Sequence, residues 1–225
     1  MNNKTKIIGC LILIALMVVF GIFLYDKLPD KVPSHFNAKG EVDGYSSRTA
    51  SIIMMPILTL VLLGFFLLIP KIEVFKENLK SFIKQYYGFI IVFTLFMFIL
   101  HITLLLRAIG YNINMADFIT FLIALLFGYI GLIMQKFKRN FFVGIRTPWT
   151  LSNDVVWKKT HELGSKTFVI NSLILLLSLF LSSGLAMWVL IVSVLLNVII
   201  LVVYSYVIYD KEIKTLKSSK PYKQS

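Results

Sequence analysis

The chain has 225 residues, of which 58% are hydrophobic and 15% are charged, and its mean hydropathy is +0.83. This composition excludes a water-soluble globular fold. Lys and Arg number 23 against 11 Asp and Glu, so the formal net charge is +12. In a soluble protein that excess would suggest nucleic-acid binding, but membrane proteins also collect Lys and Arg in their cytoplasmic loops. The single cysteine excludes an intramolecular disulfide framework and a Cys-based zinc site.

Long apolar runs predict membrane-spanning helices. Four separate runs, at residues 7–25, 52–69, 86–106 and 118–134, are long enough to cross about 30 Å of hydrocarbon. The last run, 168–209, would form a helix about 63 Å long, roughly twice the bilayer, so the chain must reverse inside it. The turn-forming residues Ser182, Ser183 and Gly184 mark the reversal. The sequence therefore predicts an all-α integral membrane protein with six transmembrane helices, the fifth ending near Ser183 and the sixth starting near Leu185.

The distribution of basic residues predicts the orientation. With the N-terminus inside, 18 of the 23 Lys and Arg fall in cytoplasmic segments and five fall outside. This bias predicts that both termini are cytoplasmic, and it accounts for the net charge without a nucleic-acid partner. The first apolar run is longer than a typical signal-peptide core and no small-residue cleavage site follows it, so we expect a retained helix.

Residues between the second and third helices alternate between an apolar and a basic face. The apolar positions recur at helical spacing, and lysines occupy another face: Phe75, Leu79, Phe82 and Ile83 against Lys76, Lys80 and Lys84. This pattern predicts an amphipathic helix at the membrane interface, attracted to anionic lipids. The lysines of the tail fit the same orientation rule, and membrane anchoring is favoured over direct nucleic-acid binding because no nucleic-acid motif accompanies them.

The outer loop after the first helix is rich in residues of fixed geometry. Its two prolines stiffen its start, and the stretch from Asn37 to Gly40 and the dipeptide Asp43-Gly44 predict turns. His35, Asn37 and Asp43 are candidate cation ligands, but no spacing fixes a site, so an ordered loop without a metal is favoured. Such a loop suits the presentation of Phe36 and Tyr45 to an extracellular partner or lid.

The segment between the fourth and fifth helices contains a second short helix. Thr150 or Ser152 is a candidate N-cap, Asp154 in the first turn favours the helix dipole, and Gly164 suits the C-terminal cap. Trp157 and His161 share one face at i, i+4 spacing. An interfacial helix with tryptophan anchors explains the aromatic residues but not the run from Gly144 to Pro148.

These two segments resemble a known family. The run 144–152, Gly-Ile-Arg-Thr-Pro-Trp-Thr-Leu-Ser, followed by Trp157, Thr160 and His161, looks like the signature of the SdpI family of bacterial membrane proteins. The outer-loop run 33–37, Pro-Ser-His-Phe-Asn, with Gly40, Asp43 and Gly44, resembles the N-terminal module that often accompanies that signature. The resemblance divides the chain into residues 1–70, a two-helix module with the extracellular loop 26–51; 71–117, an amphipathic linker and third helix; 118–210, an SdpI-like module with the cytoplasmic signature loop 135–167; and 211–225, a basic cytoplasmic tail.

Membership would imply a multi-pass protein of the bacterial plasma membrane that gives immunity to a secreted antimicrobial peptide toxin of the SdpC type. It would also imply a receptor that holds an ArsR-type autorepressor at the membrane. The expected partners are then membrane lipids, the toxin and the autorepressor, with no direct nucleic-acid contact. Together with the loop patterns described above, the resemblance predicts two sets of residues. The toxin-facing set is Pro33, His35, Phe36, Asn37, Gly40, Asp43, Gly44 and Tyr45, and the regulator-binding set is Gly144, Arg146, Thr147, Pro148, Trp149, Thr150, Trp157, Thr160, His161 and Gly164.

Three polar residues lie within the predicted helices, namely His101, Asn171 and Asn197. Hydrogen bonds to neighbouring helices are the favoured explanation, and a transport pathway is the alternative. His35 is predicted to lie outside the cell, His101 within the membrane and His161 in the cytoplasm, so no two histidines need to meet in one site. We therefore expect no catalytic residues, cofactor or metal. A six-helix transporter or channel that exports a toxin or a solute stays open as a second function.

Overall fold

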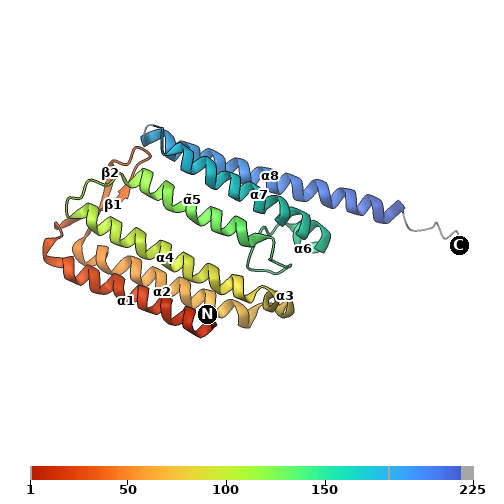
Figure 1. The fold of residues 1–225 in the computed structure, drawn as a ribbon, viewed down its shortest axis with the longest axis horizontal. Helices are drawn as coiled ribbons and strands as arrows, with labels where there is room; N and C mark the ends of the chain where they lie inside the picture. Colours follow the sequence, from red (N-terminus) through yellow and green to blue (C-terminus); the bar gives the residue numbers. More distant parts are fainter. Residues whose placement is uncertain (1, 182, 219–225) are drawn as a thin grey trace.

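The computed structural model describes residues 2–181 and 183–218, and it is dominated by long helices running side by side (Figure 1). The helices are α1 (Asn3–Leu24), α2 (Arg48–Ile72), α3 (Lys76–Ser81), α4 (Ile83–Ala108), α5 (Met115–Met134), α6 (Pro148–Ser152), α7 (Asp154–Ser178) and α8 (Ser183–Ser218), with a 3₁₀ turn η1 (Tyr25–Lys27). The four separate apolar runs became α1, α2, α4 and α5, each a few residues longer than expected at its N-terminal end.

The fold is mostly helical, as predicted, but the outer loop contains a β-hairpin that the sequence did not predict. Strands β1 (Lys31–Phe36) and β2 (Val42–Ser47) form an antiparallel hairpin, with irregular register between Pro33 and Phe36. The two strands also differ in pattern, since only β2 alternates regularly between exposed and half-buried positions. A two-stranded hairpin is marginal alone, so it depends on the helices beneath it. Val32 provides that anchor, because it is buried in a small core with Leu24, Leu28, Ile52 and Leu105.

The long helices form two groups of three. One group consists of α1, α2 and α4, and the other of α5, α7 and α8, in which α5 and α7 make the most extensive helix pair. The groups meet through α4 and α5 and through a core that includes Tyr86, Met134, Phe137 and Trp157. Residues from both groups therefore share one hydrophobic core.

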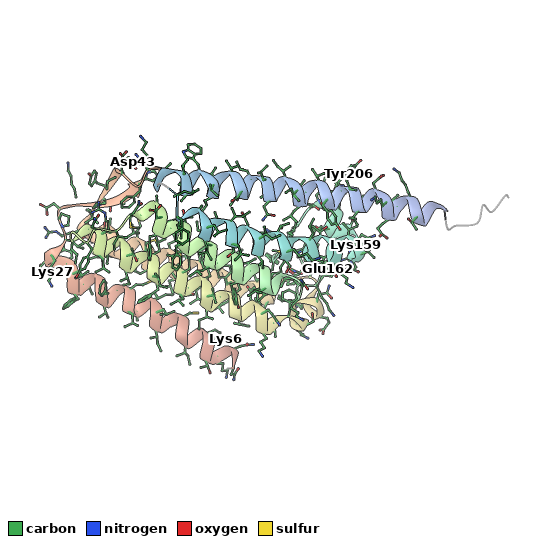
Figure 2. The ribbon with its side chains drawn as sticks, turned by 45° about the horizontal axis from the view of Figure 1, so that its top comes forward. Lys6, Lys27, Asp43, Lys159, Glu162 and Tyr206 are labelled. Atoms are coloured by element: carbon green, nitrogen blue, oxygen red, sulfur yellow. The ribbon has the colours of Figure 1, made fainter. Side chains whose placement is uncertain are left out.

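Both described ends of the chain lie at the same end of this bundle. Lys6 donates to the backbone of Lys84 at the start of α4, and Lys159 pairs with Glu212 near the end of α8. Figure 2 shows Lys159 and Glu162 far from Lys27 and Asp43, which lie with the hairpin. We call these two regions the basic end and the hairpin end.

The structure has five helices long and apolar enough to cross a membrane in its described residues: α1 with η1, α2, α4, α5 and α8. The expected fifth span corresponds to the second half of α7. Helix α7 is not among the five because its first half carries the charged residues Lys158, Lys159, Glu162 and Lys166. Helix α7 nevertheless runs beside α5 and α8 along the bundle (Figure 1). The chain reverses between Ser178 and Ser183, close to the predicted turn. The tail's residues 211–218 continue α8, and 219–225 lie outside the described residues.

Candidate functional site

The segment from Asn140 to Gly164, which we call the signature segment, is organised around His161. The imidazole is buried, at 1% exposure. Its Nδ1 lies 2.8 Å from the carbonyl oxygen of Trp157, and its Nε2 lies 3.0 Å from the backbone nitrogen of Ile145. A backbone N–H donates and a carbonyl accepts, so Nε2 must be the bare nitrogen and Nδ1 must carry the proton. The ring is therefore fixed as one neutral tautomer.

Burial lowers the pKa of His161 to about 4, even though the carbonyl of Trp157 favours the protonated form. The geometry explains why charging is unfavourable: a second proton, on Nε2, would face the N–H of Ile145. His161 therefore stays uncharged at neutral pH, and its role in the signature segment is to accept a backbone hydrogen bond.

Two further residues enclose the imidazole. The ring of Trp157 stacks on it, with centroids 4.1 Å apart, and the indole Nε1 donates to the carbonyl of Phe137 at 2.8 Å. Gly144 has a φ of +109°, and a Cβ at this position would collide with His161 Nε2. The predicted pairing of Trp157 with His161 on one helix face is confirmed. Glycine is required at position 144 for both its backbone conformation and its lack of a side chain.

The helix caps differ from the predicted ones. Thr147 caps the short helix α6 in a reciprocal capping box with Thr150, and its hydroxyl also lies 3.0 Å from Ser205 on α8. Asn153, rather than Thr150 or Ser152, caps α7 by accepting from the backbone of the next residues. Asp154 lies in the first turn of α7 as predicted.

The prediction that Gly164 ends a helix was wrong. Helix α7 continues through it to Ser178, and the expected helix and the expected fifth span are a single element. A Cβ on Gly164 would lie 2.6 Å from Ile145 and 2.7 Å from Met134. Glycine is needed here for close packing of α7 against α5 and the signature segment. Thr160, one turn earlier, is fully buried and its hydroxyl has no partner among the described residues.

Arg146, Pro148 and Trp149 form the accessible part of the signature segment. Arg146 and Pro148 are exposed, and Trp149 is half-buried. Arg146 donates to the carbonyl of Phe141 at 2.6 Å, and the ring of Trp149 lies 5.2 Å from that of Tyr206 on α8. These side chains present a cation and an aromatic surface at the basic end, whereas the other signature residues mainly hold the segment together.

Sequence reasoning missed two anchors of this segment. Asn140 is fully buried, and its side-chain amide makes four hydrogen bonds to the backbone of residues 138, 142 and 143. Glu73, 1% exposed, accepts from the backbone nitrogens of Phe75 at 2.8 Å and Phe141 at 3.1 Å. An isolated acid and an asparagine among lysines were the available signals, but the contact between residues 68 positions apart is not visible in sequence.

The predicted interfacial helix is in fact a tertiary contact. Helix α3 is only six residues long. Leu79 and Phe82 are 1% exposed, Phe82 packs on Phe137, and Phe75 stacks on Phe141 at 5.3 Å. The apolar face therefore packs against the residues that open the signature segment, instead of entering the lipid interface, and the lysines of the other face stay exposed.

At the hairpin end, hydrogen bonds shape the connection between β1 and β2. Asn37 accepts from the backbone nitrogens of Lys39 and Glu41, and its amide donates to the Glu41 carboxylate. Gly40 has a φ of +80°, and a Cβ there would lie 2.7 Å from Asn114, the N-cap of α5. The tip of the hairpin is therefore seated on the start of α5.

The remaining hairpin residues line its faces. His35 Nδ1 lies 2.5 Å from Asp43 Oδ1, and both side chains are solvent-accessible. Pro33 pairs with Tyr45, whose side chain is 59% exposed, while Phe36 and Gly44 are half-buried. Among the described residues, no group of three or more His, Cys, Asp or Glu side chains could hold a metal ion.

The intramembrane polar residues are all buried, but their hydrogen bonds are incomplete. His101, 1% exposed, lies against the backbone of Met17 on α1, and its Nε2 has no partner. Asn171 and Asn197, from α7 and α8, line the same groove, and each has one amide atom without a partner in the described chain. His101 on α4 does not line this groove, so the structure does not bring all three residues together. The two predicted sets lie at opposite ends of the bundle (Figure 2).

Comparison with known proteins agrees with this arrangement. Residues 12–60 match the model described as a domain of unknown function (DUF1648), and residues 136–205 match the SdpI/YfhL protein family. The chain is 28% identical to "Immunity protein SdpI" of Bacillus subtilis (strain 168) over 209 residues, which cover 92% of this chain and 97% of that protein. No solved structure matches. The hairpin and the second half of α1 lie in the first match, and the signature segment with α7 and most of the described α8 lies in the second. This multi-pass cell membrane protein is therefore similar to the SdpI family in its C-terminal half.

Proposed function

We propose that this protein is a membrane immunity protein that protects its cell from a secreted antimicrobial peptide toxin. The observation that carries the proposal is the extent of the likeness to Immunity protein SdpI, which runs through 92% of this chain and includes both ends of the bundle. The buried imidazole of His161 supports a binding role, because both of its ring nitrogens are hydrogen-bonded to the backbone and hold the signature segment in one shape. The transporter alternative is not favoured by this likeness.

The two ends have different tasks in the proposed mechanism. The hairpin end faces outward and recognises the toxin, and the basic end faces the cytoplasm. The excess of basic residues supports this orientation, since 18 of the 23 Lys and Arg fall in segments that the sequence predicts to be cytoplasmic. It requires α7 to cross the membrane as the sixth span, which its position between α5 and α8 supports. Tyr45, Phe36 and the His35–Asp43 pair form the surface offered to the toxin.

Helix α5 connects the two ends. Its N-cap Asn114 lies against Gly40 at the tip of the hairpin, and its last residue, Met134, lies against Gly164 of α7, which Ile145 also approaches. A toxin that shifts the hairpin would therefore act on a helix whose other end supports the signature segment. This contiguity supports signal transfer as a hypothesis.

The output in this proposal is an ArsR-type autorepressor held at the membrane by the signature segment. Arg146 and Trp149 are the side chains best suited to it, because Arg146 is exposed and Trp149 is half-buried, whereas Thr147, Thr150, Trp157, Thr160 and His161 are buried within the protein. Arginine and aromatic side chains are enriched where proteins bind one another. Capture of the repressor would lift repression of the immunity genes when toxin is present.

Expression in a toxin-sensitive bacterium tests the immunity proposal. Cells that carry the protein should survive a secreted peptide toxin that kills cells with the empty vector. Survival equal to that of the empty vector across candidate toxins, with the protein present in the membrane, would remove the proposal.

A further inference from the structure

Two cavities adjoin each other at the basic end and share Phe137 in their walls. The apolar cavity has a volume of about 340 Å³ and is lined by apolar side chains of α2, α4, α5, α7 and residues 142–145. The basic cavity has a volume of about 640 Å³ and is lined by α3, the start of α4, residues 135–139 and the first turns of α7. Both cavities lie within the range of sizes that small-molecule sites occupy.

The basic cavity carries excess positive charge. Its charged side chains are Lys136, Lys138, Arg139 and Lys158 against Asp154. Arg139 and Asp154 neutralise each other at 2.8 Å, and Arg139 is further fixed by the carbonyl of Leu151. Three lysines are left to attract a ligand, which must therefore be an anion.

These lysines are free to bind. Lys136 and Lys138 make no ion pair within the described part of the chain, and Lys158 has only Glu162 at 4.0 Å. Their side chains are exposed, so they are hydrated and mobile, and a phosphate group would draw them together at little structural cost. By contrast, the amides of Asn78 and Gln135 are already bonded, to the carbonyl of Arg139 and the hydroxyl of Ser165.

The apolar cavity suits an apolar part of a ligand rather than an anion. Its walls include Phe65, Phe89, Ile130 and Phe168, and Phe65 is 49% exposed on the outer surface of the transmembrane helix α2, so the cavity reaches the surface that lipid covers. Water gains few hydrogen bonds in such a space, whereas a hydrocarbon chain fills it favourably. The natural occupant is an acyl chain.

We propose that the two cavities together bind one anionic phospholipid, with its phosphate among Lys136, Lys138 and Lys158 and one acyl chain in the apolar cavity beside Phe137. A soluble anion would use only the basic cavity, and a neutral lipid would use only the apolar one. An anionic lipid alone matches both cavities and the shared wall between them.

The position of this site ties the lipid to the signature segment. Gly144 and Ile145 line the apolar cavity, while Trp157 and His161 line the basic one. The apolar walls come from both groups of helices, so a bound lipid braces the contact between them beneath the signature segment. This inference does not depend on the immunity proposal.

Native mass spectrometry of the full-length protein in a mild detergent tests the site. The probes are dioleoyl phosphatidylglycerol, dioleoyl phosphatidylethanolamine with the same chains, and glycerol 3-phosphate as a competitor without chains. Because each lysine near an anionic lipid strengthens binding roughly fivefold, we expect at least tenfold preference for phosphatidylglycerol over phosphatidylethanolamine. Glycerol 3-phosphate at the same concentration should leave bound phosphatidylglycerol in place.

Variants assign the preference to this site. The triple change Lys136→Gln, Lys138→Gln and Lys158→Gln should abolish the preference, whereas Lys71→Gln, Lys76→Gln and Lys84→Gln, at the same end but outside both cavities, should keep it. Ile130→Trp, which fills the apolar cavity, should weaken phosphatidylglycerol binding several-fold without a change of charge. Equal binding of the two lipids, a preference that survives in the first triple variant, or displacement by glycerol 3-phosphate would each overturn the proposal, the last by revealing a site for a soluble anion.

Discussion

His161 and Gly144 show how single residues shape the candidate site. The imidazole uses both nitrogens on the backbone, one towards Trp157 and one towards Ile145. Gly144 permits this contact because it lacks a side chain and adopts a φ of +109°. The signature segment is thus folded by a neutral histidine, and its exposed residues are free for a partner.

Replacement of Gly144 by alanine should destabilise the protein strongly. The Gly144→Ala variant would force both a disfavoured backbone conformation and a collision with His161 Nε2, which together cost about 2–4 kcal/mol. Thermal unfolding of the purified protein in detergent, followed by tryptophan fluorescence, measures the loss.

Two other glycines serve as controls for this variant. Gly110 also has a positive φ, of +105°, but a Cβ there meets nothing within 4 Å, so Gly110→Ala should show the backbone cost alone. Gly64 lies inside α2 with open space around it, so Gly64→Ala should be neutral or slightly stabilising. A Gly144→Ala variant no less stable than Gly110→Ala would contradict the packing against His161.

Stability should also depend on the protonation of His161. In the unfolded chain its pKa is near the ordinary 6.5, and burial lowers it to about 4 in the folded protein. Between these values only the unfolded state binds the proton, so stability is complete above pH 6.5, falls as the pH drops towards 4 and changes no further below that. The loss attributable to this residue is about 3 kcal/mol at most.

The His161→Gln variant separates this effect from other acid-sensitive groups. Denaturant unfolding at several pH values between 7 and 4 should give a shallower slope for the variant than for the wild type. Identical slopes would mean that His161 is not the neutral acceptor described here.

At the scale of elements, Glu73 joins parts of the chain that the sequence keeps apart. It follows α2 directly and reaches the backbone of Phe141 in the signature segment, while α3 packs over the same region through Phe75 and Phe82. The end of the first helical group therefore clamps the start of the signature segment. The apolar face of α3 therefore forms part of this clamp, whereas the sequence predicted that it would face the lipid interface.

Loss of the Glu73 carboxylate should loosen that clamp. Glu73→Ala leaves two backbone N–H groups without their acceptor and should cost about 1–3 kcal/mol, and Glu73→Gln, which keeps one acceptor oxygen, should cost less. Protection of the amide of Phe141 from hydrogen exchange should fall in the same order. Glu77→Ala, at a mostly exposed ion pair on α3, is the control and should change stability by no more than about 0.5 kcal/mol. A Glu73→Ala variant indistinguishable from this control would contradict the clamp.

The helices were predictable to the extent that length and hydropathy define them. The apolar runs of α1, α2, α4 and α5 were located correctly because no soluble alternative exists for them. The prediction divided helix α7 in two, because a glycine such as Gly164 often ends a helix. In the structure, the glycine is explained by the close approach of Ile145 and Met134, which cannot be seen in the sequence. The hairpin was missed because two prolines and an irregular register hide the strand pattern of β1.

In the candidate site, too, some contacts were predictable from the sequence and others were not. The pairing of Trp157 with His161 follows from helical spacing and was predictable. The contacts from His161 to Ile145 and from Glu73 to Phe141 were not, because a side-chain bond to the backbone of a distant loop leaves no periodic trace. The functional roles of the hairpin and signature residues stay predictions.

At the scale of the whole molecule, most basic residues belong to the segments predicted to be cytoplasmic, and the hairpin lies at the end opposite Lys159 and Glu162 (Figure 2). In the proposed orientation this separation gives one surface to the toxin and another to the repressor, with α5 and α7 between them. In these proposals the positive charge sets the orientation of the protein in the membrane, and three of the lysines bind a lipid. Nucleic-acid recognition is then not needed to explain the charge.

The repressor hypothesis makes a prediction at Arg146 and Trp149. Substitution of either residue by alanine should abolish toxin-dependent recruitment of the repressor to the membrane while protein levels stay normal, because these side chains are accessible rather than structural anchors. Fluorescence localisation of a tagged repressor measures recruitment, and Ser152→Ala, an exposed change in the same segment, is the control. Unchanged recruitment in both alanine variants would remove the output role of this surface.

Survival under toxin is the most direct test of the account. Cells expressing the wild type, a Phe36→Ala and Tyr45→Ala hairpin variant, or the empty vector would be exposed to increasing toxin, with membrane levels of each protein matched by immunoblot. The account predicts that the wild type survives concentrations that kill the vector control, and that the hairpin variant loses this protection at equal protein level. Killing of wild-type cells at the same concentration as the vector control would contradict the immunity function, and full protection by the hairpin variant would contradict toxin recognition at that end.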